Sequence, residues 1–318
     1  MDPTLEPSSA LGKLLVITGP TASGKTQVAV ELARALGGEL VGADSVQVYR
    51  GLDIGSSKPT ASELGGVPHH LLDVCAPDRE LDAAEFARLA DRAIADVRAR
   101  GRLPIVVGGS GLWLRALLRG LVQLPAVDPA LRAALHEQAI VLGTPALHAR
   151  LREVDPLAAG LIHENDQVRI VRALEVYTQT GQPLGELRAR HALGAPRYQA
   201  LRVILDWPHE LLSARIQQRT AAMFEAGFVD EVRGLLAQYG KTPRALGSVG
   251  YREVVAHLCD GVPLEATQLA VERATRIYAR RQRTWLKNEP GDLWTVTPDV
   301  LLAPEGRARL AEFLELPI

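Results

Sequence analysis

The chain has 318 residues, of which 47% are hydrophobic and 23% charged, and its formal net charge is −1 at pH 7. This composition excludes a disordered, collagen-like or membrane-embedded chain, and the near-neutral charge confines any nucleic-acid site to a local basic patch. The two cysteines match no zinc or redox spacing and the N-terminal residues do not form a signal peptide, so we expect a cytoplasmic protein, with a monomer as the default state.

The first part of the chain alternates short apolar runs with helical patterns. Residues 14–18 are typical of a strand buried on both faces, and apolar residues at helical spacing follow from Thr26 to Leu36. Residues 39–43 and 103–107 predict two more strands, and residues 112–118 predict a helix. Such alternation indicates an α/β fold with a doubly wound parallel sheet, whose ligands bind beyond the carboxyl ends of the strands.

The middle of the chain breaks this alternation. Between residue 127 and about residue 198 the strand signals vanish and helical spacing dominates. A strand is expected again at residues 203–206, and helical patterns follow over residues 211–236 and 264–286. We therefore predict a core domain formed by residues 1–126 and 199–318, interrupted by an all-helical insertion domain at residues 127–198.

The sequence GPTASGKT satisfies the G-x-x-x-x-G-K-[ST] pattern, between a predicted strand and a predicted helix. Its glycines let backbone amides converge on phosphate oxygens, its lysine neutralises charge, and Thr26 is the expected Mg²⁺ ligand. The pattern predicts a P-loop NTPase-like core whose phosphate-binding residues are Gly19, Pro20, Thr21, Ala22, Ser23, Gly24, Lys25 and Thr26. It does not distinguish ATP from another diphosphate, so a small-molecule kinase stays open.

Further motifs, spread over nearly the whole chain, resemble the tRNA dimethylallyltransferase family, also called tRNA isopentenyltransferases. With GPTASGKT they are DSVQVYRGLDIGSSKP from residue 44, GGSGLW from 108, NDQVRIVRALEVY from 165, GSVGYRE from 247 and TRIYARRQRTWLK from 275. The resemblance implies transfer of a dimethylallyl group from dimethylallyl diphosphate to the exocyclic amine of the adenosine at tRNA position thirty-seven, just 3′ of the anticodon. An adenylate isopentenyltransferase, a kinase and a non-catalytic RNA-binding protein are the alternatives.

The resemblance also implies three catalytic residues. Asp44 would take the proton that the amine loses, and Ser110 would be a second polar contact near the adenosine. Arg219 would clamp the leaving diphosphate. The alternatives are a strand-end or Mg²⁺-binding role for Asp44, a helix cap for Ser110, and an ion pair with Glu225 or Asp230 for Arg219.

Several segments are expected to grip the tRNA anticodon stem-loop, because the target base must leave its stack. Basic residues from Arg273 to Lys287 recur every three or four positions and predict an outward basic stripe, with Arg281 off the stripe and turned toward the diphosphate. The alternative to tRNA contact is that these arginines are solvated or form ion pairs. His69 and His70 are interpreted as core or turn residues. The expected tRNA contacts are Asp44, Ser45, Val46, Gln47, Ser110, Arg132, Val168, Arg169, Ile170, Val171, Arg172, Gly247, Ser248, Val249, Gly250, Tyr251, Arg252, Arg276, Arg280, Arg281, Gln282 and Arg283.

Overall fold

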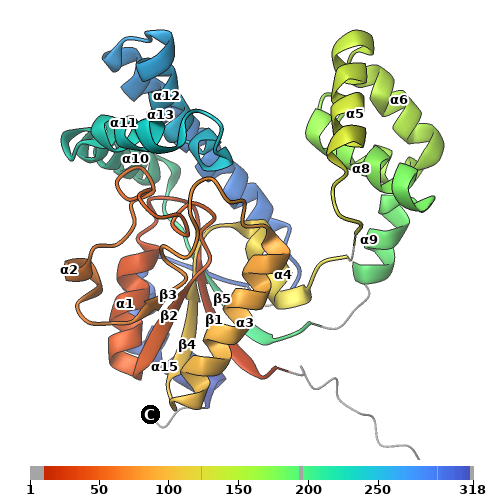
Figure 1. Ribbon diagram of the computed structural model, residues 1–318. Coiled ribbons are helices and arrows are strands. Elements are labelled where there is room, and N and C mark those ends of the chain that lie inside the picture. Colours follow the sequence, from red (N-terminus) through yellow and green to blue (C-terminus); the bar gives the residue numbers. More distant parts are fainter. Residues whose placement is uncertain (1–10, 123, 193–195, 292, 316–318) are drawn as a thin grey trace, which may run out of the picture. The chain divides into compact units, whose positions relative to one another are not determined.

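The computed structural model describes residues 11–122, 124–192, 196–291 and 293–315 (Figure 1). The chain forms two compact units, one of Met1–Gly120 with Pro196–Ile318 and the other of Leu121–Ala195. The predicted helical insertion, residues 127–198, overlaps most of the smaller unit. Among the described residues, no helix combines the length and the apolar composition needed to cross a bilayer.

A parallel sheet of six strands forms the centre of the larger unit, in the order β3-β2-β4-β1-β5-β6. This confirms the predicted α/β class. The expected strands are present, and the short β3 and β6 are additional. The bounds are β1 Lys13–Thr18, β2 Gly38–Gly42, β3 His69–His70, β4 Leu103–Val107, β5 Gln199–Leu205 and β6 Leu293–Val296.

Helices cover both faces of this sheet because alternate residues of each strand point to opposite sides. Leu15 and Ile17 of β1 join one apolar cluster with α1, α14 and α15, whereas Leu14 and Val16 are buried on the other face. On α3 and α4, Phe86 stacks on Trp113. The bounds are α1 Lys25–Leu36, α2 Ala61–Leu64, α3 Ala83–Ala99, α4 Gly111–Arg119, α14 Pro298–Leu302 and α15 Pro304–Leu314.

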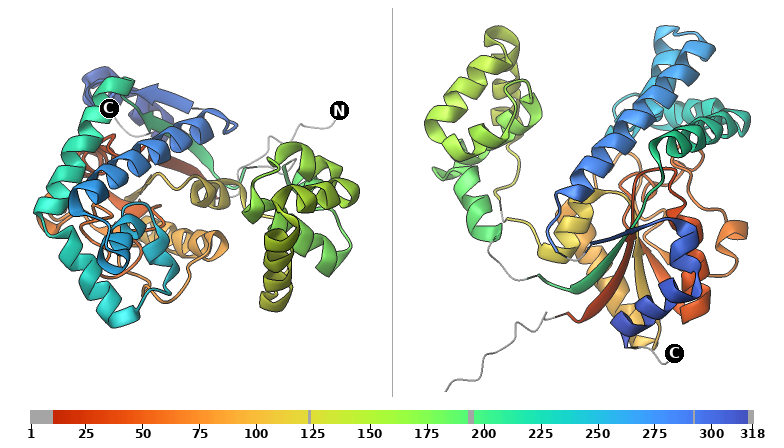
Figure 2. Two further views of the ribbon diagram at one scale, coloured as in Figure 1. Left: turned by 90° about the horizontal axis from the view of Figure 1, so that it is seen from above. Right: turned by 180° about the vertical axis from the view of Figure 1, so that it is seen from behind.

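A group of helices lies over the loops at the carboxyl ends of the strands (Figure 1). Its longest member, α13, has 24 residues and reaches from this group down to the sheet (Figure 2). The helical pattern over residues 211–236 is two helices, because Gly227 adopts a φ of 95° between them. The bounds are α10 His209–Glu225, α11 Phe228–Tyr239, a 3-10 turn at Arg244–Gly247, α12 Tyr251–Asp260 and α13 Leu264–Lys287.

The smaller unit is helical over its described residues and has its own apolar core. Leu151, Ile170 and Leu174 are among its fully buried side chains. The buried Glu175 of α8 accepts hydrogen bonds from Arg132, which joins α5 to α8, and from Arg172 on its own helix. The bounds are α5 Pro129–Leu142, α6 Thr144–Val154, α7 Pro156–Leu161, α8 Gln167–Thr180 and α9 Leu184–Ala192.

Candidate active site

The phosphate loop connects β1 to α1, as its sequence pattern predicts. Gly19 has a φ of 145°, and a Cβ atom there would lie 2.2 Å from the carbonyl oxygen of Leu205. Gly24 has a φ of 88° at the N-cap of α1. Any residue larger than glycine would be strained or would clash at these two positions. The glycines therefore allow the sharp turn that directs backbone amides toward an anion at the start of the helix.

Three side chains from distant parts of the chain brace this loop. Gln282 accepts a hydrogen bond from the Thr21 amide (2.8 Å) and donates to the Gly109 carbonyl (3.0 Å). The indole of Trp207 donates to the Ser23 carbonyl, and Arg215 donates to the Ala22 carbonyl. The loop is therefore held in shape by residues of α10, α13 and the segment after β5.

A cavity of about 490 Å³ opens at this loop, and we call it the phosphate cavity. Lys25 lies in its wall and donates to the Pro20 carbonyl (2.8 Å). The pKa of Lys25 is lowered from 10.5 to about 8. Burial is the main cause, the charge of Asp44 opposes it, and the nearby Arg219 adds a smaller lowering. The ammonium therefore sits where an added anion would be strongly favoured.

Asp44 and Ser110 meet at the carboxyl ends of β2 and β4. The Oδ1 atom of Asp44 accepts hydrogen bonds from the amides of Val46 (2.9 Å) and Gln47 (3.3 Å), which fixes the carboxylate in the cavity wall. Ser110 occupies the N-cap position of α4, yet its hydroxyl makes no cap bond and instead accepts from the Ser45 amide (2.9 Å). Both side chains thus accept hydrogen bonds from amides of the segment 45–47.

Arg219 points into the phosphate cavity from α10. Its guanidinium donates to the Thr21 hydroxyl (3.0 Å) and to the Ser56 carbonyl (3.4 Å). Burial lowers the pKa of Arg219, and the charge of Asp44 opposes that shift. The alternative partner Asp230 pairs instead with Arg233. The role of Arg219 as a diphosphate clamp stays a prediction.

A second cavity of about 290 Å³ adjoins the first, and we call it the neighbouring cavity. The two share wall residues that include Asp44, Arg219 and Tyr278. Aliphatic side chains such as Ile216 and Val271 contribute to the neighbouring cavity. Its wall also includes the residues Val46, Gly247, Ser248, Val249 and Gly250, which were expected to meet the target nucleotides.

Some buried polar atoms around the phosphate loop have no hydrogen-bond partner among the described residues. They include Ser23 Oγ, Arg219 Nε and both ring nitrogens of His69. Buried polar groups in folded proteins are nearly always paired, so such a concentration needs an explanation. A polar ligand bound at the phosphate loop would provide one.

Two residues of this site were missed at the sequence level. His69 lines the phosphate cavity, where burial lowers its pKa to about 4, but a strand of two residues leaves no periodic signal. Burial also raises the pKa of Tyr278, which lines both cavities and faces Asp44. The spacing of Tyr278 four residues before Gln282 places both on one helix face, and that signal was present in the sequence.

Helix α13 presents only part of the expected basic stripe. Arg273, Arg276, Arg280 and Lys287 are exposed on it. Arg283 instead binds the carboxylate of Asp206 and the carbonyl of Trp207, and Arg276 pairs with Glu272. The expected inward turn of Arg281 is wrong, because Arg281 is exposed and the buried Gln282 takes the inward place.

Other expected tRNA contacts divide into exposed and buried side chains. Val168 and Arg169 are exposed on α8, whereas Ile170, Val171 and Tyr251 are buried, so an exposed contact surface does not include these three. The ion-pair alternative holds for several arginines. Arg132 and Arg172 bind Glu175, Arg252 binds Glu253, and Arg169 pairs with Asp166. Contact of any of these residues with tRNA stays a prediction.

Comparisons with known proteins agree on one family. The profile described as IPP transferase matches residues 47–289. The tRNA dimethylallyltransferase of Anaeromyxobacter sp. (strain K) is 54% identical over 286 residues, which cover 90% of this chain and 93% of that relative. The full-length tRNA isopentenylpyrophosphate transferase of Bacillus halodurans is 35% identical with a TM-score of 0.69, and the match covers 95% of this chain and 97% of that one. A eukaryotic dimethylallyltransferase acting on tRNA is 27% identical with a TM-score of 0.79, over 96% of this chain and 81% of that one.

Proposed function

Because the chain belongs to the tRNA dimethylallyltransferase family, we propose that its two adjoining cavities form the site where a dimethylallyl group passes from dimethylallyl diphosphate to a tRNA adenosine. The phosphate cavity would hold the diphosphate, and the neighbouring cavity would receive the adenine. The observation that carries this assignment is the position of Asp44, whose side chain lines both cavities beside Arg219.

The phosphate cavity supplies what the leaving group needs. The bond between the allylic carbon and the diphosphate oxygen breaks, and its electron pair leaves with the diphosphate. Loop amides, Lys25 and Arg219 would stabilise that growing negative charge, because they are fixed donors in a largely desolvated site. The unpartnered Nε of Arg219 and the hydroxyl of Ser23 add two donors at the same place.

The incoming exocyclic amine forms the new carbon–nitrogen bond and must lose a proton. We assign that proton to Asp44, whose carboxylate is held by the Val46 and Gln47 amides at the junction of the cavities. A carboxylate within hydrogen-bond reach is a suitable acceptor for a nitrogen that becomes positively charged as it attacks. Tyr278 lines both cavities and would orient the adenine. Ser110 would assist through Ser45, whose amide donates to its hydroxyl and which lines the neighbouring cavity.

Magnesium fits the residues at the phosphate loop. Thr26 lies in the cavity wall near Asp44, and hydroxyl and carboxylate oxygens are donors that Mg²⁺ prefers. The described residues contain no group of three metal-ligating side chains, so the ion would be held by Thr26 together with diphosphate oxygens and water. When bound, it would neutralise charge on the leaving diphosphate.

The tRNA would contact exposed residues of α13 and of the smaller unit. The exposed arginines of α13 include Arg273 and Arg280, and Arg169 is exposed on α8. Arginine's fixed fork of donors suits phosphate oxygens, which supports contact with the anticodon stem-loop. A grip of this kind favours tRNA over free adenylate as the acceptor. A monomeric state and a cytoplasmic location stay predictions.

The test is transfer of radiolabel from dimethylallyl diphosphate to total tRNA, with free AMP and an EDTA-treated sample in parallel. We expect label in tRNA only, and its loss with EDTA. The variant Arg219→Ala should lower kcat/KM for the diphosphate by about 10²–10³-fold, as loss of one donor to a developing anion typically does. The control Arg233→Ala removes an exposed arginine that pairs with Asp230, and should keep full activity. Label in AMP alone, or an unchanged Arg219→Ala variant, would contradict the proposal.

A further inference from the structure

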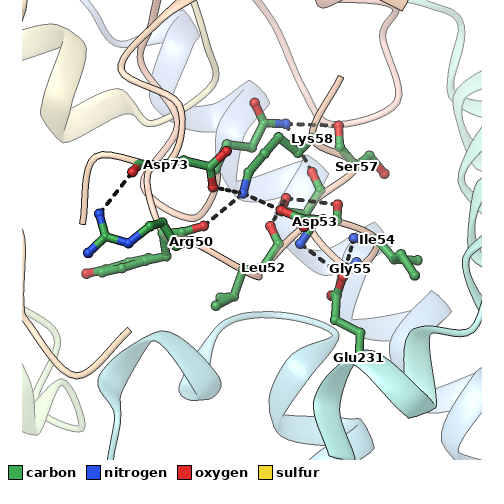
Figure 3. Close-up of polar contacts among 12 residues, drawn as sticks. Arg50, Leu52, Asp53, Ile54, Gly55, Ser57, Lys58, Asp73 and Glu231 are labelled. Atoms are coloured by element: carbon green, nitrogen blue, oxygen red, sulfur yellow. Dashed lines mark hydrogen bonds and ion pairs between the residues drawn. The ribbon is translucent and has the colours of Figure 1, made fainter. Parts of the chain in front are cut away.

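The carboxylate of Glu231 lies outside both cavities, in the first turn of α11, yet it accepts four hydrogen bonds. Its Oε2 atom accepts from the amides of Asp53 (3.0 Å) and Ile54 (2.6 Å). Its Oε1 atom accepts from the amide of Gly55 (3.1 Å) and the hydroxyl of Tyr251 (2.8 Å). Figure 3 shows Glu231 reaching the three consecutive amides. A carboxylate offers about four acceptor sites, so every site of Glu231 is engaged.

The turn that Glu231 binds is also tightly packed. A Cβ atom on Gly55 would lie 2.1 Å from the ring of Phe228, so only glycine fits there. The fully buried rings of Phe228 and Tyr251 pack edge to face, with centroids 5.1 Å apart. The backbone at Gly55 therefore rests directly on the same aromatic pair that places the Tyr251 hydroxyl against Glu231.

A buried ammonium holds the same loop from its other side. Lys58, whose side chain is 6% exposed, donates to the Tyr49 carbonyl and to the carboxylates of Asp53 and Asp73 (Figure 3). All three ammonium donors are thus used, two on Tyr49 and Asp53 in the loop that begins at Asp44 and one on Asp73, which follows β3. The loop is held by Lys58 and by Glu231, which restricts where the two residues between Gly55 and Lys58 can lie.

Ser56 follows this turn directly and reaches the active site. Its carbonyl oxygen accepts hydrogen bonds from Arg219 (3.4 Å) and from Gln47 (3.1 Å), and the residue lines both cavities. We propose that Glu231 is a positioning residue for the diphosphate site: it fixes the turn of residues 53–55, and that turn sets the Ser56 carbonyl that orients Arg219. This inference rests on the proposed function only for the identity of the ligand as a diphosphate.

The four hydrogen-bond donors around Glu231 require a carboxylate there, because it offers only acceptors. In Glu231→Gln one acceptor oxygen becomes an NH₂ group, and in either orientation of the amide that group faces two of the four donors. The turn must then move to relieve the donor–donor contacts. Displacements of about 1 Å at a binding group can cost up to about 10²-fold, so a measurable loss of diphosphate affinity is expected.

The experiment measures the Kd of inorganic diphosphate with Mg²⁺ by isothermal titration, using the full chain without tRNA. Glu231→Gln should raise that Kd about tenfold. The matched control is Asp91→Asn, since Asp91 also accepts from a tyrosine hydroxyl and an arginine, Tyr198 and Arg197, just before the amino end of β5. We expect the control to stay within about twofold of the unchanged protein.

A double-mutant cycle separates positioning from a general loss of stability. If Glu231 acts through Arg219, then Glu231→Gln should weaken binding by less than about twofold once Arg219→Ala is present. Equal weakening in both backgrounds, or no weakening by Glu231→Gln alone, would overturn the proposal. Tyr251→Phe removes one of the four donors and provides a milder second variant, for which we expect a two- to threefold rise that also depends on Arg219. Diphosphate binding without label transfer to tRNA would contradict the proposed function and leave this test intact.

Discussion

The pKa of Lys25 predicts how diphosphate use depends on pH. The ammonium is the lysine of the phosphate loop, and burial lowers its pKa from 10.5 to about 8. Only its protonated form attracts the diphosphate, so kcat/KM, which reports the free enzyme, should fall as pH rises through that value. The bound anion favours the charged form and raises the pKa, so kcat should hold to a higher pH than kcat/KM.

The size of the effect follows from simple titration. With a pKa of about 8, roughly 91% of the lysine is protonated at pH 7 and about 9% at pH 9. We therefore expect kcat/KM for dimethylallyl diphosphate to fall about tenfold between these values. His69, with a pKa lowered to about 4, and Tyr278, whose pKa is raised by burial, do not titrate in this range.

Steady-state rates of label transfer to tRNA, measured at saturating tRNA in half-unit steps from pH 6.5 to 9.5, test the reasoning. In Lys25→Arg the guanidinium stays charged, so the alkaline fall should disappear even if the absolute rate is lower. A flat kcat/KM from pH 7 to 9 in the unchanged protein would refute the assignment. An identical fall in Lys25→Arg would assign the titration to another group.

Three further predictions concern the base, the loop and the smaller unit. Asp44→Asn should lower kcat by about 10²–10⁴-fold without weakening the binding of inorganic diphosphate, and a variant that transfers label at the unchanged rate would contradict the role of this carboxylate. Lys58→Met leaves Asp53 and Asp73 without their shared cation and should lower the free energy of unfolding by about 1–3 kcal/mol, measured by urea denaturation against the exposed control Lys241→Met. Leu151→Ala opens a cavity in the core of the smaller unit and should destabilise it by about 2–5 kcal/mol, so tRNA affinity should fall while diphosphate affinity holds. Equal loss of both affinities would show that tRNA binding and diphosphate binding are not assigned to separate units.

Local patterns in the chain were sufficient to predict the phosphate loop and its setting. The spacing of Gly19, Gly24 and Lys25 is typical of a phosphate loop between a strand and a helix. Both glycines have a positive φ, which other residues rarely adopt. Parallel strands bring their carboxyl ends to one edge of the sheet. Asp44 follows the predicted strand at residues 39–43 and Ser110 follows the one at residues 103–107, so both lie at the same edge as the loop. The family motifs then indicated a diphosphate with a prenyl group.

Helix periodicity shows which residues share a face, but not which face meets the sheet. That is why Arg281 was expected to turn inward, whereas Gln282 and Tyr278 take that position. Charge patterns likewise identify arginines without naming their partners. Only the packed structure shows that Arg132 and Arg172 hold the buried Glu175, whose pKa desolvation would raise but which hydrogen bonds from both arginines hold below its ordinary value.

The sequence alone therefore predicted the type of ligand and determined which edge of the sheet carries the phosphate loop, because both depend on short-range spacing and on the geometry of parallel strands. The tertiary structure decided which distant side chains complete the site. Glu231 meets the amides of residues 53–55 across some 177 positions of the chain, and Gln282 meets Thr21 across 261. No local sequence pattern predicts such contacts, since they form only when the helices after β5 pack over the loops at the edge of the sheet.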